Sequence, residues 1–288
     1  MKLVVAKEIG YCYGVKDAID EVVKVSQETQ GEVHTFGPLI HNPRAVQELK
    51  DRYNISSIED ISELKGNTLA IRAHGIPPKV LESFLESGIN VVDTTCPFVR
   101  KTQNKARKLV DEGYFVIILG KKKHPEVVGI AGHVEGNCLL VETKDDLKNL
   151  KRKRKIGIVF QSTITVKDMG ELLPLIAEYC KELKIHTTIC DVTTRRQDEA
   201  RLISKQVDYM IVIGGKNSSN TTKLARICEQ EGVPTVQVEH PHEVKELPLK
   251  DVASVGVTTG TSTPQNVIDD ILSEIMTRSK SLELSLNS

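Results

Sequence analysis

The sequence has no excess of charge of either sign, because 39 lysine and arginine residues balance 39 aspartate and glutamate residues. A protein that binds duplex nucleic acid normally carries a basic excess, so nucleic acid is not expected as a partner. Tryptophan is absent and aromatic residues make up only 4% of the chain, which leaves few surfaces on which bases could stack. The longest apolar runs, such as residues 114–119, fall far below the roughly 18 residues that span a bilayer. The apolar part of the N-terminal segment is too short for a signal peptide, so we expect a soluble, cytoplasmic protein without a membrane partner.

Motifs of the common nucleotide-binding and metal-binding folds are also missing. No GxGxxG opens a helix after a candidate strand, and no GxxxxGK[ST] occurs. The cysteines are too few for a disulfide scaffold in a chain of this size, and no CxxC pair is present, which excludes zinc-ribbon and thioredoxin-like sites. In a reducing compartment, cysteines with a chemical role are more often metal ligands or nucleophiles. The six candidates are Cys12, Cys96, Cys138, Cys180, Cys190 and Cys228.

One order of strands, loops and helices is repeated along the chain. A β-forming segment leads to Cys12, and the apolar residues after it have the spacing of an amphipathic helix. Two strand–loop–helix units follow before a strand at 89–95 leads to Cys96. The same order continues to Cys190, with a helix expected at about 98–112, another that includes Met169 to Cys180, and a strand at 185–189.

The third copy begins at Cys190 and lacks a final strand, and the N-terminal strand that leads to Cys12 can fill this place. The distance from each of these cysteines to a polar loop is nearly constant: 29 residues from Cys12 to His41, 28 from Cys96 to His124, and 28 from Cys190 to Ser218. We therefore predict an α/β fold of three lobes around a pseudo-threefold axis, each with a small, mainly parallel sheet. The predicted lobes are residues 13–96, residues 97–189, and residues 190–278 together with residues 1–12, and residues 279–288 are expected to form a disordered tail.

Cys12, Cys96 and Cys190 each lie between the end of a strand and the start of a helix, where the helix dipole favours a thiolate. Ligands bind at the carboxyl ends of strands in parallel sheets, so all three lobes are expected to turn these ends toward one cavity. Three converging thiolates suit a metal or cluster with one position left unfilled by the protein. Zinc is possible, but an iron–sulfur cluster is the better match for three soft ligands. Cys138, Cys180 and Cys228 occupy apolar positions and are expected to serve only packing.

The remaining loops at the predicted strand ends carry imidazoles, hydroxyls and amides, the groups that bind an oligophosphate. Glu126 is the only acid among them, and a carboxyl group near an anionic ligand should have a raised pKa, which makes it a candidate proton donor. Ser262 could instead serve as part of a capping box for the last helix. The candidate binding residues are His41, His74, His124, Ser162, Ser218, Ser219, Asn220 and Ser262.

These residues lie in motifs that resemble one known family over residues 1–278. The motifs are Gly-Tyr-Cys12-Tyr-Gly-Val, Gly-Pro-Leu-Ile-His41-Asn-Pro, Arg-Ala-His74-Gly, Asp-Thr-Thr-Cys96-Pro, His124-Pro-Glu126-Val, Thr-Ile-Cys190, Asn217-Ser-Ser-Asn220 and Gly260-Thr-Ser262. The chain is similar to the 4-hydroxy-3-methylbut-2-enyl diphosphate reductases, which catalyse the last step of the non-mevalonate isoprenoid pathway. At position 162 this chain has Ser where the family usually has Thr.

The resemblance implies a trefoil of three α/β lobes around a central [4Fe–4S] cluster, with Cys12, Cys96 and Cys190 as ligands and one open iron. It implies that the loop residues above bind the diphosphate, that Glu126 supplies protons, and that ferredoxin or flavodoxin donates electrons. The products would be isopentenyl and dimethylallyl diphosphate. Two alternatives stay open: an iron–sulfur dehydratase similar to quinolinate synthase, and a non-enzymatic iron–sulfur sensor. The basic runs at 121–123 and 151–155 are interpreted as solvated faces, with a docking patch for an acidic electron carrier as the alternative.

Overall fold

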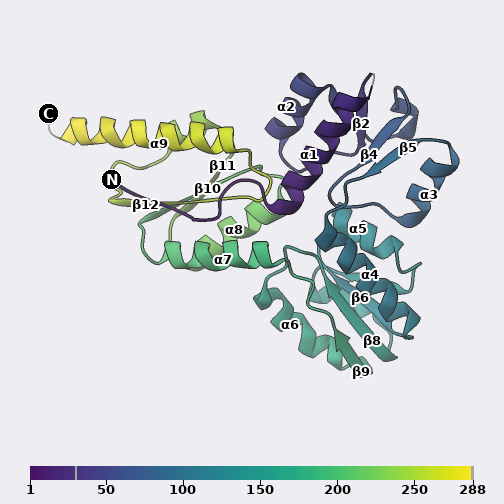
Figure 1. The fold of residues 1–288 in the computed structure, drawn as a ribbon. Coiled ribbons are helices and arrows are strands. Elements are labelled where there is room, and N and C mark those ends of the chain that lie inside the picture. The colour runs from purple at the N-terminus through teal and green to yellow at the C-terminus, as the bar shows by residue number, and fades with distance from the viewer. Residues whose placement is uncertain (30, 287–288) are drawn as a thin grey trace. The chain divides into compact units, whose positions relative to one another are not determined.

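The computed structural model describes residues 1–29 and 31–286, which form three four-stranded sheets with helices between the strands (Figure 1). Every strand pairing within the described residues is parallel, as expected for sheets built from strand–helix–strand units. No helix in the described part of the chain is long and apolar enough to cross a membrane.

The first sheet along the chain has the strand order β3-β2-β4-β5. Its strands are β2 (Val33–Phe36), β3 (Ile55–Ile58), β4 (Thr68–Ile71) and β5 (Asn90–Asp93). The helices in this part of the sequence are α1 (Tyr13–Glu28), α2 (Pro43–Tyr53) and α3 (Pro78–Glu86), with a short 3-10 helix at Ile61–Glu63.

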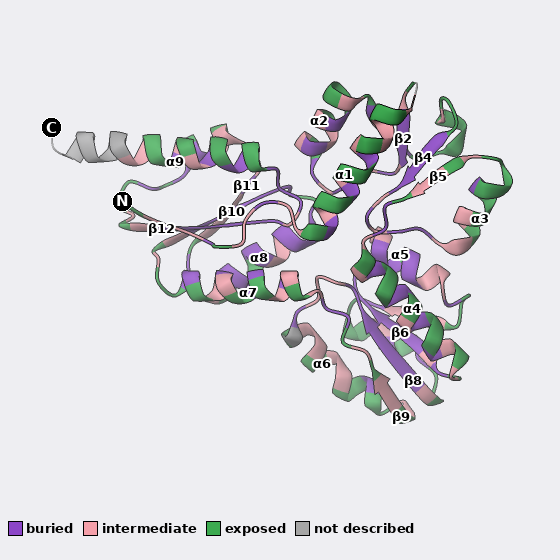
Figure 2. Cartoon of the chain, viewed as in Figure 1, coloured by how far each residue is buried: buried purple, intermediate pink, exposed green. Residues whose placement is uncertain are grey.

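The second sheet has the order β7-β6-β8-β9. Its strands are β6 (Phe115–Leu119), β7 (Cys138–Val141), β8 (Lys153–Phe160) and β9 (Cys180–Ile185). The accompanying helices are α4 (Pro97–Asp111), α5 (Pro125–Gly132) and α6 (Val166–Ala177), with a 3-10 helix at Lys144–Asn149. The central strand β6 and the last five residues of β8 carry no charged side chain and are almost fully buried, as expected for strands of a parallel sheet with both faces covered, and Figure 2 shows both strands as mostly buried.

The third sheet has the order β1-β12-β10-β11, so the first strand of the chain completes the last lobe, as the sequence predicted. Its strands are β1 (Lys2–Val5), β10 (Tyr209–Ile213), β11 (Thr235–Val238) and β12 (Ser254–Thr259). Its helices are α7 (Asp191–Ser204), α8 (Ser219–Gln230) and α9 (Gln265–Leu286), with a 3-10 helix at Pro241–Glu246. The strand that leads to a cysteine occupies the same edge in all three sheets, which confirms the prediction of three related α/β lobes.

The chain divides into two compact units. One contains Met1–Lys16, Ile40–Glu48 and Asp191–Ser288, and therefore the third sheet. The other contains Asp17–Leu39 and Leu49–Cys190, and therefore the first two sheets. Each sheet falls within the residues predicted for one lobe, while the lobe boundaries themselves stay a prediction.

Three details differ from the sequence-based prediction. The helix expected to include Cys180 ends at Ala177, and Cys180 instead begins β9, because this edge strand pairs with β8. The strand after the basic run was expected to begin at Lys155, yet β8 begins at Lys153, and Lys153 and Arg154 are exposed. Residues 279–286 continue α9 instead of forming a disordered tail, since no glycine or proline follows Pro264 to end the helix; residues 287–288 lie outside the described residues.

Candidate functional site

The structure places the three predicted cysteine ligands in identical local settings. The backbone N–H of each donates to the carbonyl oxygen of the second residue after the neighbouring central strand. These bonds are Cys12 to Thr261, Cys96 to Ala73, and Cys190 to Ser162, each 3.0 Å long. Cys12 and Cys190 directly precede α1 and α7, and Cys96 is the N-cap of α4. Each half-buried thiol therefore lies at a helix N-terminus, where a thiolate is stabilised.

The other three cysteines have surroundings that disfavour a thiolate. Burial raises the pKa of Cys138 in β7, of Cys180 in β9 and of Cys228 in α8. Cys228 is completely buried in a core cluster, and the other two border apolar clusters. Their neutral thiols are small apolar side chains in these positions.

In the second unit, two predicted histidines lie side by side. His124 is the N-cap of α5, where its Nδ1 accepts a hydrogen bond of 3.2 Å from the N–H of Glu126. The rings of His74 and His124 meet edge to face, with 5.2 Å between their centroids. The loop after β4 and the loop after β6 therefore present imidazoles to the same place.

Glu126 is a buried carboxyl group held by one neighbour. Only 2% of the residue is exposed, and Ser162 donates to both carboxylate oxygens, from its N–H at 2.8 Å and from its Oγ at 2.7 Å. Burial raises the pKa of Glu126 to about 7, although the two hydrogen bonds from Ser162 act in the opposite direction. The sequence analysis expected a raised pKa from a nearby anionic ligand, whereas in the structure the cause is burial of Glu126 by the protein itself. A carboxyl group with this pKa can donate a proton near neutral pH.

Two glutamines that the sequence analysis did not single out support these loops. The Oε1 of Gln161 accepts a hydrogen bond of 2.9 Å from the N–H of Lys121, which ties the loop before His124 to the end of β8. Gln103 packs against Gly75, where an added Cβ would lie 2.6 Å from its Nε2. Gly75 has φ +71°, so the turn after His74 requires glycine both for its backbone and for space. A Gln directly after a strand and a Gly directly after a loop histidine are the sequence signals.

In the first unit, the loop after β10 and the loop after β12 both contact the segment that precedes α2. The Oγ of Ser262 donates to the carbonyl of His41 at 3.4 Å, and a Cβ on Gly215 would lie 3.1 Å from the same carbonyl. The hydroxyl of Ser262 therefore contacts the His41 loop. In a capping box it would instead have contacted the first turn of the last helix. Asn42 caps α2 by accepting a 3.0 Å bond from Ala45 N–H.

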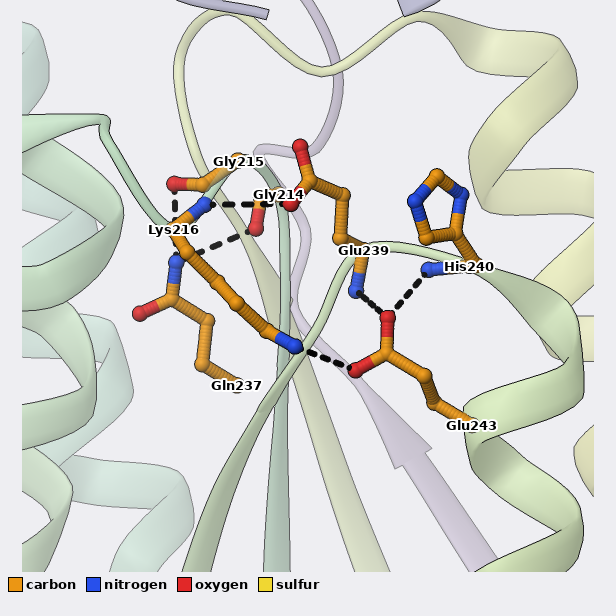
Figure 3. A network of polar contacts seen from close by, with 7 residues as sticks. All are labelled: Gly214, Gly215, Lys216, Gln237, Glu239, His240 and Glu243. Carbon is orange, nitrogen blue, oxygen red and sulfur yellow. Dashed lines mark hydrogen bonds and ion pairs between the residues drawn. The ribbon is translucent and has the colours of Figure 1, made fainter. Parts of the chain in front are cut away.

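The loop after β10 leads to three more predicted residues, Ser218, Ser219 and Asn220. Polar contacts with β11 and the segment after it, together called the brace, hold this loop. Figure 3 shows the brace: Lys216 forms an ion pair of 2.9 Å with Glu243, and Gln237 Nε2 donates to the carbonyls of Gly214 and Gly215. The N–H groups of Glu239 and His240 also donate to Glu243, which fixes this carboxylate. The brace holds the loop at the start of α8.

Asn220 in the first turn of α8 has polar atoms that the protein leaves unused. Its Nδ2 and Oδ1 are both buried and have no hydrogen-bond partner among the described residues. Ser218 is the N-cap of the same helix, and its Oγ accepts from Thr221 N–H at 3.3 Å. Buried polar groups are normally satisfied, so the amide of Asn220 fits a polar ligand at this helix N-terminus.

All the site residues predicted from the sequence lie in loops at the carboxyl ends of parallel strands or in the helical turns that follow. Cys12, His41, Ser218, Ser219, Asn220 and Ser262 belong to the first unit or its loops, and Cys96, Cys190, His74, His124, Glu126 and Ser162 belong to the second. The first set offers hydroxyls, an amide and helix N-termini that suit an anion, and the second set includes a buried acid.

Comparison with known proteins agrees with this chemistry. A family model described as LytB protein matches residues 3–276. A 4-hydroxy-3-methylbut-2-enyl diphosphate reductase from Geobacter sp. (strain M21) is 39% identical over 276 residues, which cover 96% of this chain and 97% of the relative. The protein of the same name from Aquifex aeolicus is 38% identical over 277 residues, 95% of either chain.

Two solved structures are also similar. A structure of (E)-4-hydroxy-3-methyl-but-2-enyl diphosphate reductase, described as the terminal enzyme of the non-mevalonate pathway, is 37% identical with a TM-score of 0.72 and covers 96% of this chain and 99% of its own. The corresponding reductase from Plasmodium falciparum is 26% identical with a TM-score of 0.89, over 94% of this chain and 87% of its own.

Proposed function

Because the chain belongs to the LytB protein family, we propose that it reduces (E)-4-hydroxy-3-methylbut-2-enyl diphosphate to isopentenyl diphosphate and dimethylallyl diphosphate. The observation that carries this proposal is the threefold cysteine setting, in which Cys12, Cys96 and Cys190 form the same backbone hydrogen bond at a helix N-terminus. The fold needs no thiol at these places, so the repetition indicates a common ligand.

Cys12, Cys96 and Cys190 would hold a [4Fe–4S] cluster with one open iron. When bound, this cluster supplies electrons one at a time and a Lewis acid for the substrate hydroxyl. Three thiolates at helix N-termini fit such a group, and the raised pKa values of Cys138, Cys180 and Cys228 argue against those thiols as ligands. The electron donor in this proposal is reduced ferredoxin or flavodoxin.

The protein's own groups bind the diphosphate in this proposal. Asn220 supplies a buried amide without another partner, and Ser218, Ser219 and Ser262 supply hydroxyls next to helix N-termini. These neutral donors stabilise an anion without the cost of burying several cations. The imidazoles of His41, His74 and His124 complete the set of groups that bind the diphosphate.

Glu126 protonates the departing hydroxyl group. Replacement of an allylic hydroxyl by hydrogen takes two electrons and two protons, one on the leaving oxygen and one on either of two carbons of the allyl group. A buried carboxyl group with a pKa of about 7 holds the first of these protons near neutral pH. Ser162 keeps the carboxyl group in place through its N–H and Oγ. The serine at position 162 thus keeps a hydroxyl beside the proposed acid, and its Oγ donates to Glu126 at 2.7 Å.

The test is anaerobic turnover of the reduced protein with the allylic diphosphate, followed by separation of the products. We expect both isopentenyl and dimethylallyl diphosphate. A dehydrated product formed without reductant would favour an enzyme similar to quinolinate synthase. A protein that carries a cluster and leaves the diphosphate unchanged would favour a sensor.

A further inference from the structure

Arg196 in α7 is a buried cation without a carboxylate partner. Only 2% of the residue is exposed, and its Nε has no hydrogen-bond partner among the described residues. Its Nη2 donates to the carbonyl of Gly10 at 2.8 Å, and its Nη1 donates to the carbonyl of Thr259 at 3.1 Å. No ion pair joins it to a carboxylate in the described part of the chain. Burying a guanidinium is costly unless an opposite charge is near, so the surroundings must supply one.

The nearby acids are occupied by other groups. Glu8 accepts a 2.6 Å bond from the Nε of the exposed Arg195, and Glu199 accepts a 2.8 Å bond from the N–H of Lys7. Burial lowers the pKa of Arg196, and charges on Cys12, Glu8 and Glu199 act against this fall. Because its Nη2 donates to the carbonyl of Gly10, two residues before Cys12, a thiolate at Cys12 would be a favourable counter-charge for Arg196.

The same guanidinium fixes the turn that leads to Cys12. Gly10 has φ +76°, and its N–H donates to Thr259 Oγ1 at 2.9 Å. Arg196 holds the carbonyls of both Gly10 and Thr259, so it joins the end of β12 to the turn two residues before Cys12. An arginine makes this double contact because its planar fork presents several donors at once.

The other lobes do without such a residue. Arg196 lies six residues after Cys190, and the positions six residues after Cys12 and Cys96 are occupied by Ala18 and Thr102. Both of these residues are buried on helices that begin at their cysteines. The fold of a lobe therefore does not require a cation at this position, so Arg196 is not part of the structure that the three lobes share.

We propose that Arg196 is a positioning residue that orders the Cys12 loop and places a fixed positive charge beside the cluster, which raises the cluster's reduction potential. The inference rests on the proposed function, because it requires the cluster. Each added electron makes the cluster and its thiolates more negative, and a nearby cation in a medium of low dielectric constant stabilises the reduced state. Arg196 thus favours transfer of electrons from the proposed donor, reduced ferredoxin or flavodoxin, to the cluster.

The test compares Arg196→Gln and Arg196→Lys with the wild-type holoprotein, with Arg195→Gln as the matched control from an exposed neighbour. The readout is the midpoint potential of the cluster, measured anaerobically by electron paramagnetic resonance during a redox titration. We expect Arg196→Gln to lower the equilibrium constant for reduction at least tenfold, which is 59 mV for one electron. Arg196→Lys keeps the charge and should stay near wild type, as should Arg195→Gln.

A wild-type potential in Arg196→Gln with full iron and sulfide content would overturn the proposal. If Arg196→Gln does not retain a cluster, the Lys variant decides: a potential near wild type supports the charge effect, and a tenfold fall in its reduction constant contradicts it. Absence of iron and sulfide from the wild-type protein would refute the proposed function itself. This result is distinct from a failure of the Arg196 proposal, which requires a protein that holds the cluster.

Discussion

Burial and the two Ser162 hydrogen bonds act on Glu126 in opposite directions, and burial prevails. The result is an acid that keeps its proton near neutral pH, while both of its oxygens are held by a single residue. Glu126 could be predicted from the sequence because it is the only acid among the polar loops expected at the strand ends. The partner that holds both oxygens could not be derived from spacing, because the contact joins residues 36 positions apart.

Replacing Glu126 by Gln should lower kcat by about 10²–10⁴-fold, the range of general acid catalysis, and change substrate affinity far less. Glutamine keeps the shape and hydrogen-bonding capacity but has no proton to transfer. Binding of the substrate to the oxidised protein, measured without turnover, separates affinity from rate. Normal turnover by Glu126→Gln would mean that the proton comes from the substrate diphosphate or from water.

His41→Ala and Ser262→Ala are the matched contrast, since they should mainly weaken binding. In the proposed function their groups bind a diphosphate whose charge is the same in the ground state and in the transition state. We expect a rise in the dissociation constant of the substrate with a smaller effect on kcat. A variant of either residue with unchanged affinity would remove it from the binding set.

The rate should depend on pH through Glu126. Its pKa of about 7 means that the acid is protonated below this pH and loses its proton above it. The kcat of the wild type should therefore fall as the pH rises through 7 or somewhat higher, because the bound diphosphate further disfavours the carboxylate. This alkaline limb should be absent from the residual activity of Glu126→Gln. The same limb in both proteins would assign it to another group.

Some loop glycines lie where neighbouring atoms leave little room for a side chain. Gly75 and Gly88 both adopt a positive φ, yet a Cβ at Gly75 would meet Gln103 at 2.6 Å, whereas nothing lies within 4 Å of one at Gly88. The two positions therefore separate the cost of the backbone conformation from the cost of overpacking. The sequence predicted loops at strand ends, and only the packing shows which of their residues admit no substitution.

Gly75→Ala should accordingly destabilise the protein more than Gly88→Ala. Both substitutions cost about 1–2 kcal/mol for a left-handed conformation, and Gly75→Ala adds roughly 1–3 kcal/mol of overpacking against the β-branched Thr95, 3.1 Å from the added Cβ, and the end of Gln103. Unfolding of both variants in denaturant measures the difference directly. Equal stabilities would mean that Gln103 moves aside without cost.

The three cysteine ligands should respond to substitution as one set. Cys12→Ser, Cys96→Ser and Cys190→Ser should each lose most of the cluster and the activity, because each removes one of three thiolates. Cys138→Ser, Cys180→Ser and Cys228→Ser should retain iron and sulfide and lose stability only through local packing. Iron and sulfide counts per chain after anaerobic purification measure the effect. A full cluster in Cys190→Ser would contradict the assignment.

The whole molecule follows from one unit used three times, and this repetition made the fold predictable. The spacing of cysteines and polar loops revealed the lobes, and the N-terminal strand takes the predicted place beside β12. Edge elements were predicted less well. The strand β3 was missed and Cys180 was assigned to a helix, because short edge strands are defined by their pairing partners more than by their own periodicity. Arg196 could not be predicted from the repeat, because the corresponding positions in the other two lobes are Ala18 and Thr102, which carry no charge.

The most direct test of the account is the number of electrons consumed for each product molecule. The reduced protein is mixed anaerobically with a known amount of (E)-4-hydroxy-3-methylbut-2-enyl diphosphate, and oxidation of the reductant is followed together with product formation. Our account predicts two electrons for each isopentenyl or dimethylallyl diphosphate formed, and none when substrate is omitted. Conversion of the diphosphate without consumption of reductant would contradict it.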